Sequence, residues 1–107
     1  MASPLLTVFV TCASKKEADF IASAVVKEKL AACANFFPMS SRYIWNGQFT
    51  KSTEYALLLK TPRRLFAKLS ARIKKLHSYS LPAIVAWEDA AVDAQYHSWV
   101  LHACKNR

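Results

Sequence analysis

The sequence has very little glycine: Gly47 is the only one in 107 residues. Phosphate loops of the P-loop kind need several closely spaced glycines, because only a bare backbone can approach a phosphate group closely. A backbone cradle for nucleotide phosphates is therefore excluded. The sequence also lacks a glycine-flanked nucleophile elbow and a recognisable pair of catalytic carboxylates. We therefore expect the chain not to be an enzyme.

Cysteine pairs and long apolar runs are lacking as well. The three cysteines, Cys12, Cys33 and Cys104, form neither a CxxC motif nor an even-numbered set. Residues 1–4 contain no charged segment leading into a long apolar one, so no secretory signal is expected. These features predict reduced thiols in the cytoplasm. No apolar run approaches the roughly 20 residues of a membrane-spanning helix, so no membrane partner is expected.

Acidic residues are scarce, since 7 Asp and Glu stand against 15 Lys and Arg, which gives a net charge of +8. The imbalance is concentrated: no acidic residue occurs from Tyr55 through Trp87, and much of the basic charge lies between Lys60 and Lys75. Such a block attracts RNA or another acidic partner. It is equally typical of a solvated helix face, which is the favoured interpretation. Nucleic acid is therefore not the expected partner.

Apolar periodicity predicts four strands and three helices in the order β-α-β-β-α-β-α. The predicted strands cover residues 5–12, 32–45, 48–60 and 83–87, and the helices cover residues 15–30 and begin at residues 61 and 88. Ser14 and Glu17 form a capping box that begins the first helix. This order is typical of an α+β, ferredoxin-like fold, with a four-stranded antiparallel sheet and helices on one face. We expect one domain over residues 1–107.

The lone glycine follows an asparagine, and Asn46-Gly47 predicts a type I′ turn between the two central strands. In that register Trp45 faces Gln48, and Ile44 faces Phe49. Each arm has about 13 residues, against about 5–6 in a typical strand. The distal half should project beyond a single domain, and long strand edges pair readily with another chain. We therefore expect self-association through residues 40–55.

Six short motifs occur in order along the chain: LAAC at residues 30–33, YIWNGQ at 43–48, LLLKT at 57–61, LHSY at 76–79, LPAI at 81–84 and YHSW at 96–99. Together they resemble the CutA family of divalent-cation tolerance proteins, over nearly the whole chain. The resemblance implies a ferredoxin-like homotrimer, similar to the PII-type signalling proteins and closed by pairing of the long hairpins. It also implies a non-enzymatic role, either associated with copper and other divalent metals or in small-ligand signalling and regulation.

The resemblance implies two metal ligands, Cys12 and His77, for copper or another divalent cation. Bacterial members bind copper through a cysteine near the end of the first strand and two adjacent histidines, and Leu76 replaces the first of these here. Thiolate and imidazole suit copper or zinc. Two ligands are fewer than structural or catalytic zinc sites use. Both readings therefore stay open, and a structural role for Cys12 and His77 is favoured over metal binding.

The resemblance also implies a cleft between subunits, lined by Trp45, Glu54, Lys60, Tyr79, Tyr96 and Trp99. A lysine and phenol oxygens in a wet cleft suit an anion or a small metabolite. Ion pairs and aromatic packing that only stabilise the trimer are an equal alternative. Glu54 and Lys60 lie six residues apart on one strand, roughly 20 Å at strand rise, so they cannot pair within that strand. The acidic residue that the family has after its LP motif is Ala83 here.

Two other classes of function remain as alternatives. The basic block suits a ferredoxin-like RNA-binding module, although such modules stack bases on aromatic residues of their middle strands. Here those strands are mainly aliphatic, as Val8 and Leu57 illustrate, and the glycine-aromatic motif of that class is missing. An uncharacterised enzyme that uses the intersubunit cleft is the second alternative.

Overall fold

The computed structural model describes residues 4–107. The expectation that the chain lacks a secretory signal was based on residues 1–4, and residues 1–3 lie outside the described range. The elements are β1 (Leu5–Cys12), α1 (Lys15–Lys27), β2 (Cys33–Trp45), β3 (Gln48–Pro62), a 3-10 turn (Arg63–Leu65), α2 (Phe66–Leu76), β4 (Ile84–Glu88) and α3 (Ala94–Ala103). The strands form one antiparallel sheet in the order β2-β3-β1-β4. This confirms the predicted α+β, ferredoxin-like fold. Among the described residues, no helix combines the length and apolarity needed to cross a membrane.

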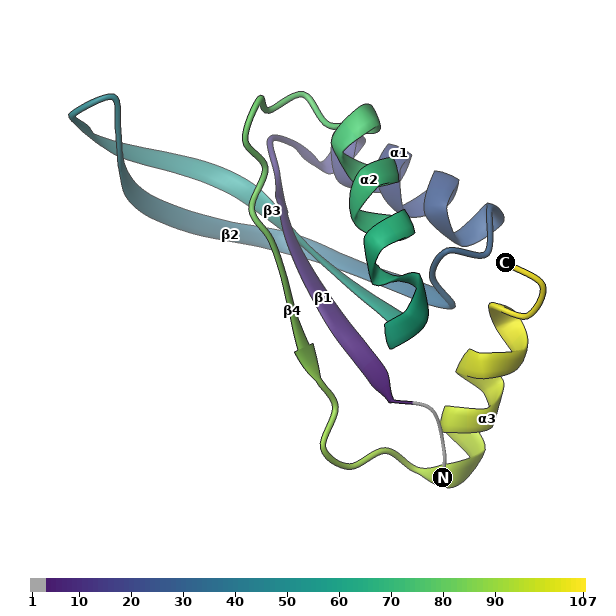
Figure 1. The fold of residues 1–107 in the computed structure, drawn as a ribbon. Helices are drawn as coiled ribbons and strands as arrows, with labels where there is room; N and C mark the ends of the chain where they lie inside the picture. The colour runs from purple at the N-terminus through teal and green to yellow at the C-terminus, as the bar shows by residue number, and fades with distance from the viewer. Residues whose placement is uncertain (1–3) are drawn as a thin grey trace.

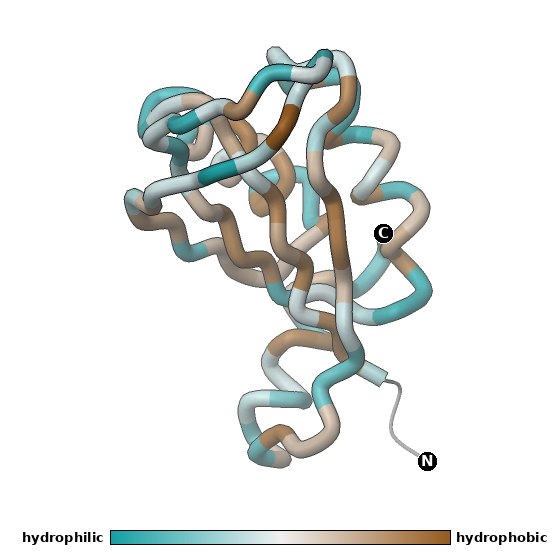
Figure 2. The backbone as a smooth tube through the Cα atoms, turned by 90° about the vertical axis from the view of Figure 1, so that its left-hand side faces the viewer, coloured by the Kyte–Doolittle hydropathy of each residue, from teal (hydrophilic) through white to brown (hydrophobic). Residues whose placement is uncertain are grey.

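The core lies between the sheet and the pair of helices α1 and α2, which cover one face (Figure 1). Alternate residues of the two central strands point into it, and apolar residues recur along the strands in Figure 2. The fully buried side chains from both layers include Val8, Val10, Leu57, Leu59, Ile21, Val25, Leu69 and Ile73. Helix α3 packs separately at one end of the sheet, where Val100 and Cys104 contact Leu5. Among residues 4–107, no helix covers most of the opposite face of the sheet (Figure 1).

Helix α1 begins as predicted, because the Ser14 side chain accepts a hydrogen bond from the backbone N–H of Glu17 at 3.1 Å. The predicted end at residue 30 is wrong, and the helix ends at Lys27. Lys29 has a positive φ of 62°, and the N–H of Leu30 turns back to the carbonyl of Val25 at 2.9 Å. Leu30 keeps the apolar period but is buried in the turn that follows.

The starts of the other two helices are also corrected. Thr61 was expected to cap the second helix, but it lies within β3, which ends at Pro62, and it donates its hydroxyl proton to the carbonyl of Leu30 at 2.8 Å. The α-helix begins only at Phe66, after the 3-10 turn. Residue 88 was expected to begin the last helix, but Glu88 ends β4. The cap is Asp93, whose carboxylate accepts from two backbone N–H groups of the first turn.

The β2–β3 hairpin has the predicted register, with Trp45 opposite Gln48 and Ile44 opposite Phe49. Asn46 and Gly47 have φ values of 51° and 77°, as a type I′ turn requires. The tip of the hairpin projects far from the body of the molecule (Figure 1). Ile44 is 72% exposed and Phe49 is 66% exposed. The single chain therefore leaves the apolar tip uncovered, as the sequence predicts.

Candidate functional site at the base of the hairpin

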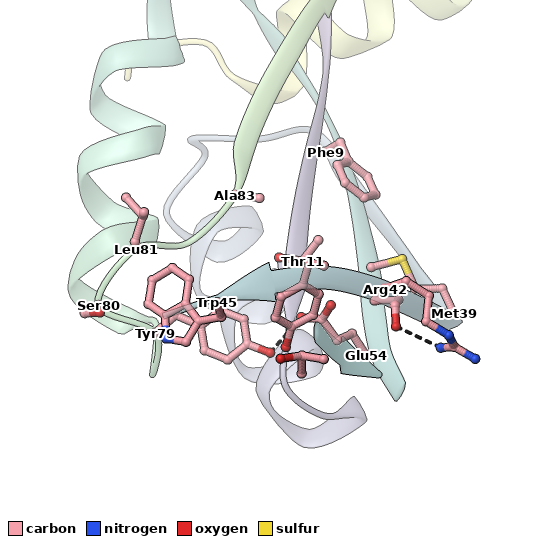
Figure 3. A pocket seen from close by; sticks show the side chains of 13 residues that line it. Phe9, Thr11, Met39, Arg42, Trp45, Glu54, Tyr79, Ser80, Leu81 and Ala83 are labelled. Carbon is pink, nitrogen blue, oxygen red and sulfur yellow. Dashed lines mark hydrogen bonds between the residues drawn. The ribbon is translucent and has the colours of Figure 1, made fainter. Parts of the chain in front are cut away.

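A cavity of about 670 Å³ lies where the hairpin leaves the body of the protein (Figure 3). Its walls come from β1, β2, β3 and the segment between α2 and β4. The lining residues are Phe9, Thr11, Met39, Ser41, Arg42, Tyr43, Trp45, Thr50, Glu54, Tyr79, Ser80, Leu81 and Ala83. Three of the predicted cleft residues, Trp45, Glu54 and Tyr79, therefore lie around one cavity within a single chain.

A buried carboxylate anchors this cavity. Glu54 is only 6% exposed, and the Tyr79 hydroxyl donates to its carboxylate at 2.7 Å (Figure 3). Burial raises the pKa of Tyr79, and the hydrogen bond to Glu54 raises it further. The phenol therefore keeps its proton and acts as a donor. This bond ties the segment after α2 to the middle of β3.

A second group of polar side chains consists of Cys12, Glu17 and His77. Their potential metal-coordinating atoms lie within 4.8 Å of one another. The His77 side chain has no exposed surface. Its Nδ1 accepts the backbone N–H of Tyr79 at 3.0 Å, so Nε2 carries the proton and donates to the carbonyl of Thr11 at 2.7 Å. The imidazole is therefore neutral and uses both nitrogens to join β1 to the segment after α2.

Glu17 belongs to this group, although sequence reasoning gave it only a capping role. One carboxylate oxygen accepts the backbone N–H of Ala13, and the other accepts that of Ser78, both at 2.9 Å. Desolvation would raise the pKa of Glu17, but the hydrogen bonds from Ala13 and Ser78 outweigh it and lower the pKa. The contact with Ser78 had no signal in the sequence, because the two residues lie on segments far apart in the chain.

The donor types of this group suit copper or zinc, but their present arrangement does not fit a resident ion. Burial raises the pKa of the Cys12 thiol to about 12, so the sulfur keeps its proton. One nitrogen of His77 carries a proton, and the other already accepts a hydrogen bond. An ion would have to displace that proton and break a buried hydrogen bond. Metal binding by Cys12 and His77 thus stays a prediction, and the geometry favours the structural alternative.

The other three predicted cleft residues lie elsewhere in the chain. Lys60 donates to the hydroxyl of Thr7, and Tyr96 and Trp99 stack at a ring-centre distance of 5.7 Å on α3. Within one chain, the six residues therefore form two separate groups, as the spacing of Glu54 and Lys60 implies. Whether a second copy joins the groups into one cleft stays a prediction.

The sequence showed no partner for Cys33, and the structure supplies one. Its sulfur lies 3.2 Å from the hydroxyl oxygen of Tyr96. Burial, followed by this hydrogen bond, raises the pKa of Tyr96 to about 12. Tyr96 is 38% exposed and Trp99 is 49% exposed. The apolar period of α3 therefore continues onto surface that the single chain leaves open.

The hydrogen bonds of Glu17 lead to a pH-dependent prediction. Because the folded state lowers the pKa of Glu17, its ionised form stabilises the protein above the unfolded pKa, and this stability is lost as the pH falls through the folded value. We expect Glu17→Gln to lower the free energy of unfolding by about 1–2 kcal/mol at neutral pH. Urea unfolding should show this difference narrowing below about pH 4. A difference in unfolding free energy between the native chain and Glu17→Gln that stays constant with pH would contradict the role of the Glu17 charge. Asp19→Asn, on the exposed face of α1, is the matched control.

The sheet order, the helices on one face and the over-long central hairpin define a ferredoxin-like protein with a projecting β-ribbon. Comparison with known proteins makes this class more specific. Residues 6–103 match the family model of the CutA1 divalent ion tolerance protein. The chain belongs to the CutA family of divalent-cation tolerance proteins, as its motifs indicate.

Individual relatives support the assignment over nearly the full length of both chains. The divalent-cation tolerance protein CutA of Thermus thermophilus is 42% identical over 94 residues, which cover 87% of this chain and 91% of the relative. Among solved structures, CutA1 from Oryza sativa superposes with a TM-score of 0.95 at 29% identity, covering 99% of this chain and 98% of the other. A CutA from Archaeoglobus fulgidus, described as periplasmic, reaches 0.93 at 32% identity, with 94% and 99% covered.

Proposed function

We propose that this chain acts in divalent-cation tolerance as a non-enzymatic homotrimer with a small-ligand signalling or regulatory role. The observation that carries the proposal is the β2–β3 hairpin, whose apolar tip is exposed in the single chain. Exposed apolar surface of this kind marks a site of association. The uncovered face of the sheet adds to it, since Phe37 and Val85 are each about half exposed there. Burial of both surfaces in an assembly would account for the high hydrophobic content of so short a chain, 53% of its residues.

The mass of the purified protein in solution tests this assembly. Light scattering coupled to size exclusion is expected to give about 36 kDa, three times the chain mass of 12.0 kDa. The mass should stay constant on dilution into the micromolar range. A monomer of 12.0 kDa under these conditions would overturn the proposed assembly.

We further propose that cation tolerance does not depend on an ion held by Cys12 and His77. The protonated thiol and the fully engaged imidazole support this view. Calorimetric titration with Zn(II) and Cu(II) is therefore expected to give the same affinity, within about twofold, for the native chain and for Cys12→Ser/His77→Ala. Cys33→Ser controls for binding at an accessible thiol. A loss of about tenfold or more in the double variant alone would restore Cys12 and His77 as ligands.

The two rival functions have less support. RNA binding would need free basic groups, yet Arg72 forms a bidentate pair with Glu28, with N···O distances of 2.8 and 2.9 Å. Arg64 donates to the main-chain carbonyls of Cys104 and Arg107 at 3.1 and 2.6 Å, so it holds the C-terminal segment. Catalysis in the cleft has little support, because the hydroxyl–carboxylate contact described there joins Glu54 to Tyr79, whose raised pKa keeps the phenol protonated and weakly nucleophilic. The three free cysteines support a cytoplasmic location, which we also propose.

A further inference from the structure

A second cavity, of about 390 Å³, lies at the opposite end of the sheet from the hairpin tip. Its lining residues come from β3, β4, α3 and the segment that joins β4 to α3, a segment whose path is visible in Figure 1. Its larger lining side chains are those of Lys60, Trp87, Glu88, Asp89, Val92 and Tyr96. Its volume is at the small end of ligand pockets, which span about 300–1,000 Å³. A compact metabolite therefore suits it better than a nucleotide.

One hydroxyl holds a positive and a negative group side by side in this cavity. The Thr7 hydroxyl accepts a hydrogen bond from Lys60 and donates its own proton to Asp89 at 2.7 Å. Thr7 is 4% exposed and lies directly opposite Lys60 in the β1–β3 ladder, so its position is set by the sheet. The backbone N–H of Asp89 donates to the carbonyl of Leu5 at 2.9 Å, which fixes the acidic residue as well.

Both charged groups retain hydrogen-bonding capacity toward a ligand. An ammonium group has three N–H donors and a carboxylate has several acceptor positions, so one bond to Thr7 uses only part of each. The neighbouring acid, Glu88, is already paired with Arg63 at 3.0 Å. The charge that the cavity presents is therefore one ammonium and one carboxylate, close together.

This pairing selects against ligands of one sign. A simple anion would be attracted by Lys60 and repelled by Asp89. A simple cation would be attracted by Asp89 and repelled by Lys60. A molecule that carries a carboxylate and an ammonium close together satisfies both groups at once, as an α-amino acid does. We propose that this cavity binds a free α-amino acid, with its carboxylate on Lys60 and its ammonium group on Asp89. The proposal rests on the small-ligand role proposed above and names the class of that ligand.

The rest of the cavity indicates which amino acids fit. Trp87 is 49% exposed at one wall, and Val92 lies in the segment that leads into α3. Tyr96, braced by Trp99, supplies an aromatic surface. These walls would contact an apolar or aromatic side chain rather than a charged one. L-leucine and L-phenylalanine are therefore the probes of choice.

Calorimetry with these two amino acids tests the proposal against matched derivatives. N-acetyl-L-leucine lacks the ammonium group and L-leucinamide lacks the carboxylate, so each is expected to bind at least about tenfold more weakly than L-leucine. Lys60→Met and Asp89→Asn are expected to weaken L-leucine binding by a similar factor. Lys16→Met and Asp19→Asn, both at exposed positions of α1, make the same charge changes elsewhere and should leave the affinity unchanged. Melting curves verify that each variant folds.

Three results would overturn the amino-acid proposal. The first is no heat of binding for either amino acid at millimolar concentration and above. The second is equal affinity for L-leucine and N-acetyl-L-leucine, which would indicate an anion site. The third is unchanged binding of L-leucine in both Lys60→Met and Asp89→Asn. Failure of the trimeric assembly would be visible separately in light scattering, so a trimer without amino-acid binding would refute this inference alone.

Discussion

Aspartate at both Ile44 and Phe49 is expected to convert the proposed trimer into a folded monomer. The two residues face each other across the hairpin and are 72% and 66% exposed in the single chain. A carboxylate that becomes buried without a partner costs several kcal/mol, so we expect a loss of at least about 3 kcal/mol in assembly for each substitution. The core should be spared, because neither side chain belongs to it.

Light scattering measures the loss of assembly, and urea unfolding of the monomeric form measures whether the core is still stable. The double variant should have the mass of one chain and retain the circular dichroism of the native fold. Ala67→Asp/Ala71→Asp adds the same charge to the exposed side of α2 and should leave the mass at about 36 kDa. A trimeric Ile44→Asp/Phe49→Asp variant would show that the hairpin tip is not the contact surface.

Replacing His77 with alanine is expected to lower the free energy of unfolding by about 3 kcal/mol or more. The imidazole has no exposed surface, and its loss would leave the carbonyl of Thr11 and the N–H of Tyr79 without their buried partner. Each orphaned group costs about 1–3 kcal/mol, and the vacated volume adds a cavity term. The effect should approach that of truncating a core leucine.

Urea unfolding measures this loss on a scale set within the same protein. Leu57→Ala, at a fully buried position, should cost about 2–5 kcal/mol. His102→Ala, on the exposed side of α3, should stay within about 0.5 kcal/mol of the native chain. A His77→Ala variant that loses less than about 1 kcal/mol would refute the structural role assigned to the imidazole.

Local chemistry accounts for the parts of the fold that were predictable. The capping box at Ser14 and the Asn46-Gly47 turn depend on neighbouring residues alone, and both formed as predicted. The ends of helices were less predictable, because apolar periodicity does not stop where a helix stops. Leu30 continues the apolar period of α1 beyond the end of the helix. The Thr61 hydroxyl donates to the carbonyl of Leu30 and does not cap a helix.

The candidate sites were also predictable only in part. The closeness of Cys12 and His77 was expected from family resemblance, whereas Glu17 entered the group only through the fold. The hydrogen bonds that link Lys60 to Thr7 and Thr7 to Asp89 could not be predicted from the sequence, because the three residues come from β3, β1 and the segment after β4. Sheet register brings such residues together, and it is set by long-range pairing that no short motif encodes.

The sequence by itself determined the order of strands and helices, the hairpin with its single glycine, and the family. Each follows from local propensity, from periodicity or from ordered motifs. Only the tertiary structure decided which groups share a cavity and which protons they hold. Burial, with the nearby charges of Glu17 and Glu54, raises the pKa of the Cys12 thiol and keeps it protonated, and two hydrogen bonds fix the tautomer of His77. Those properties depend on contacts between distant segments, because desolvation and pairing exist only once the chain has folded.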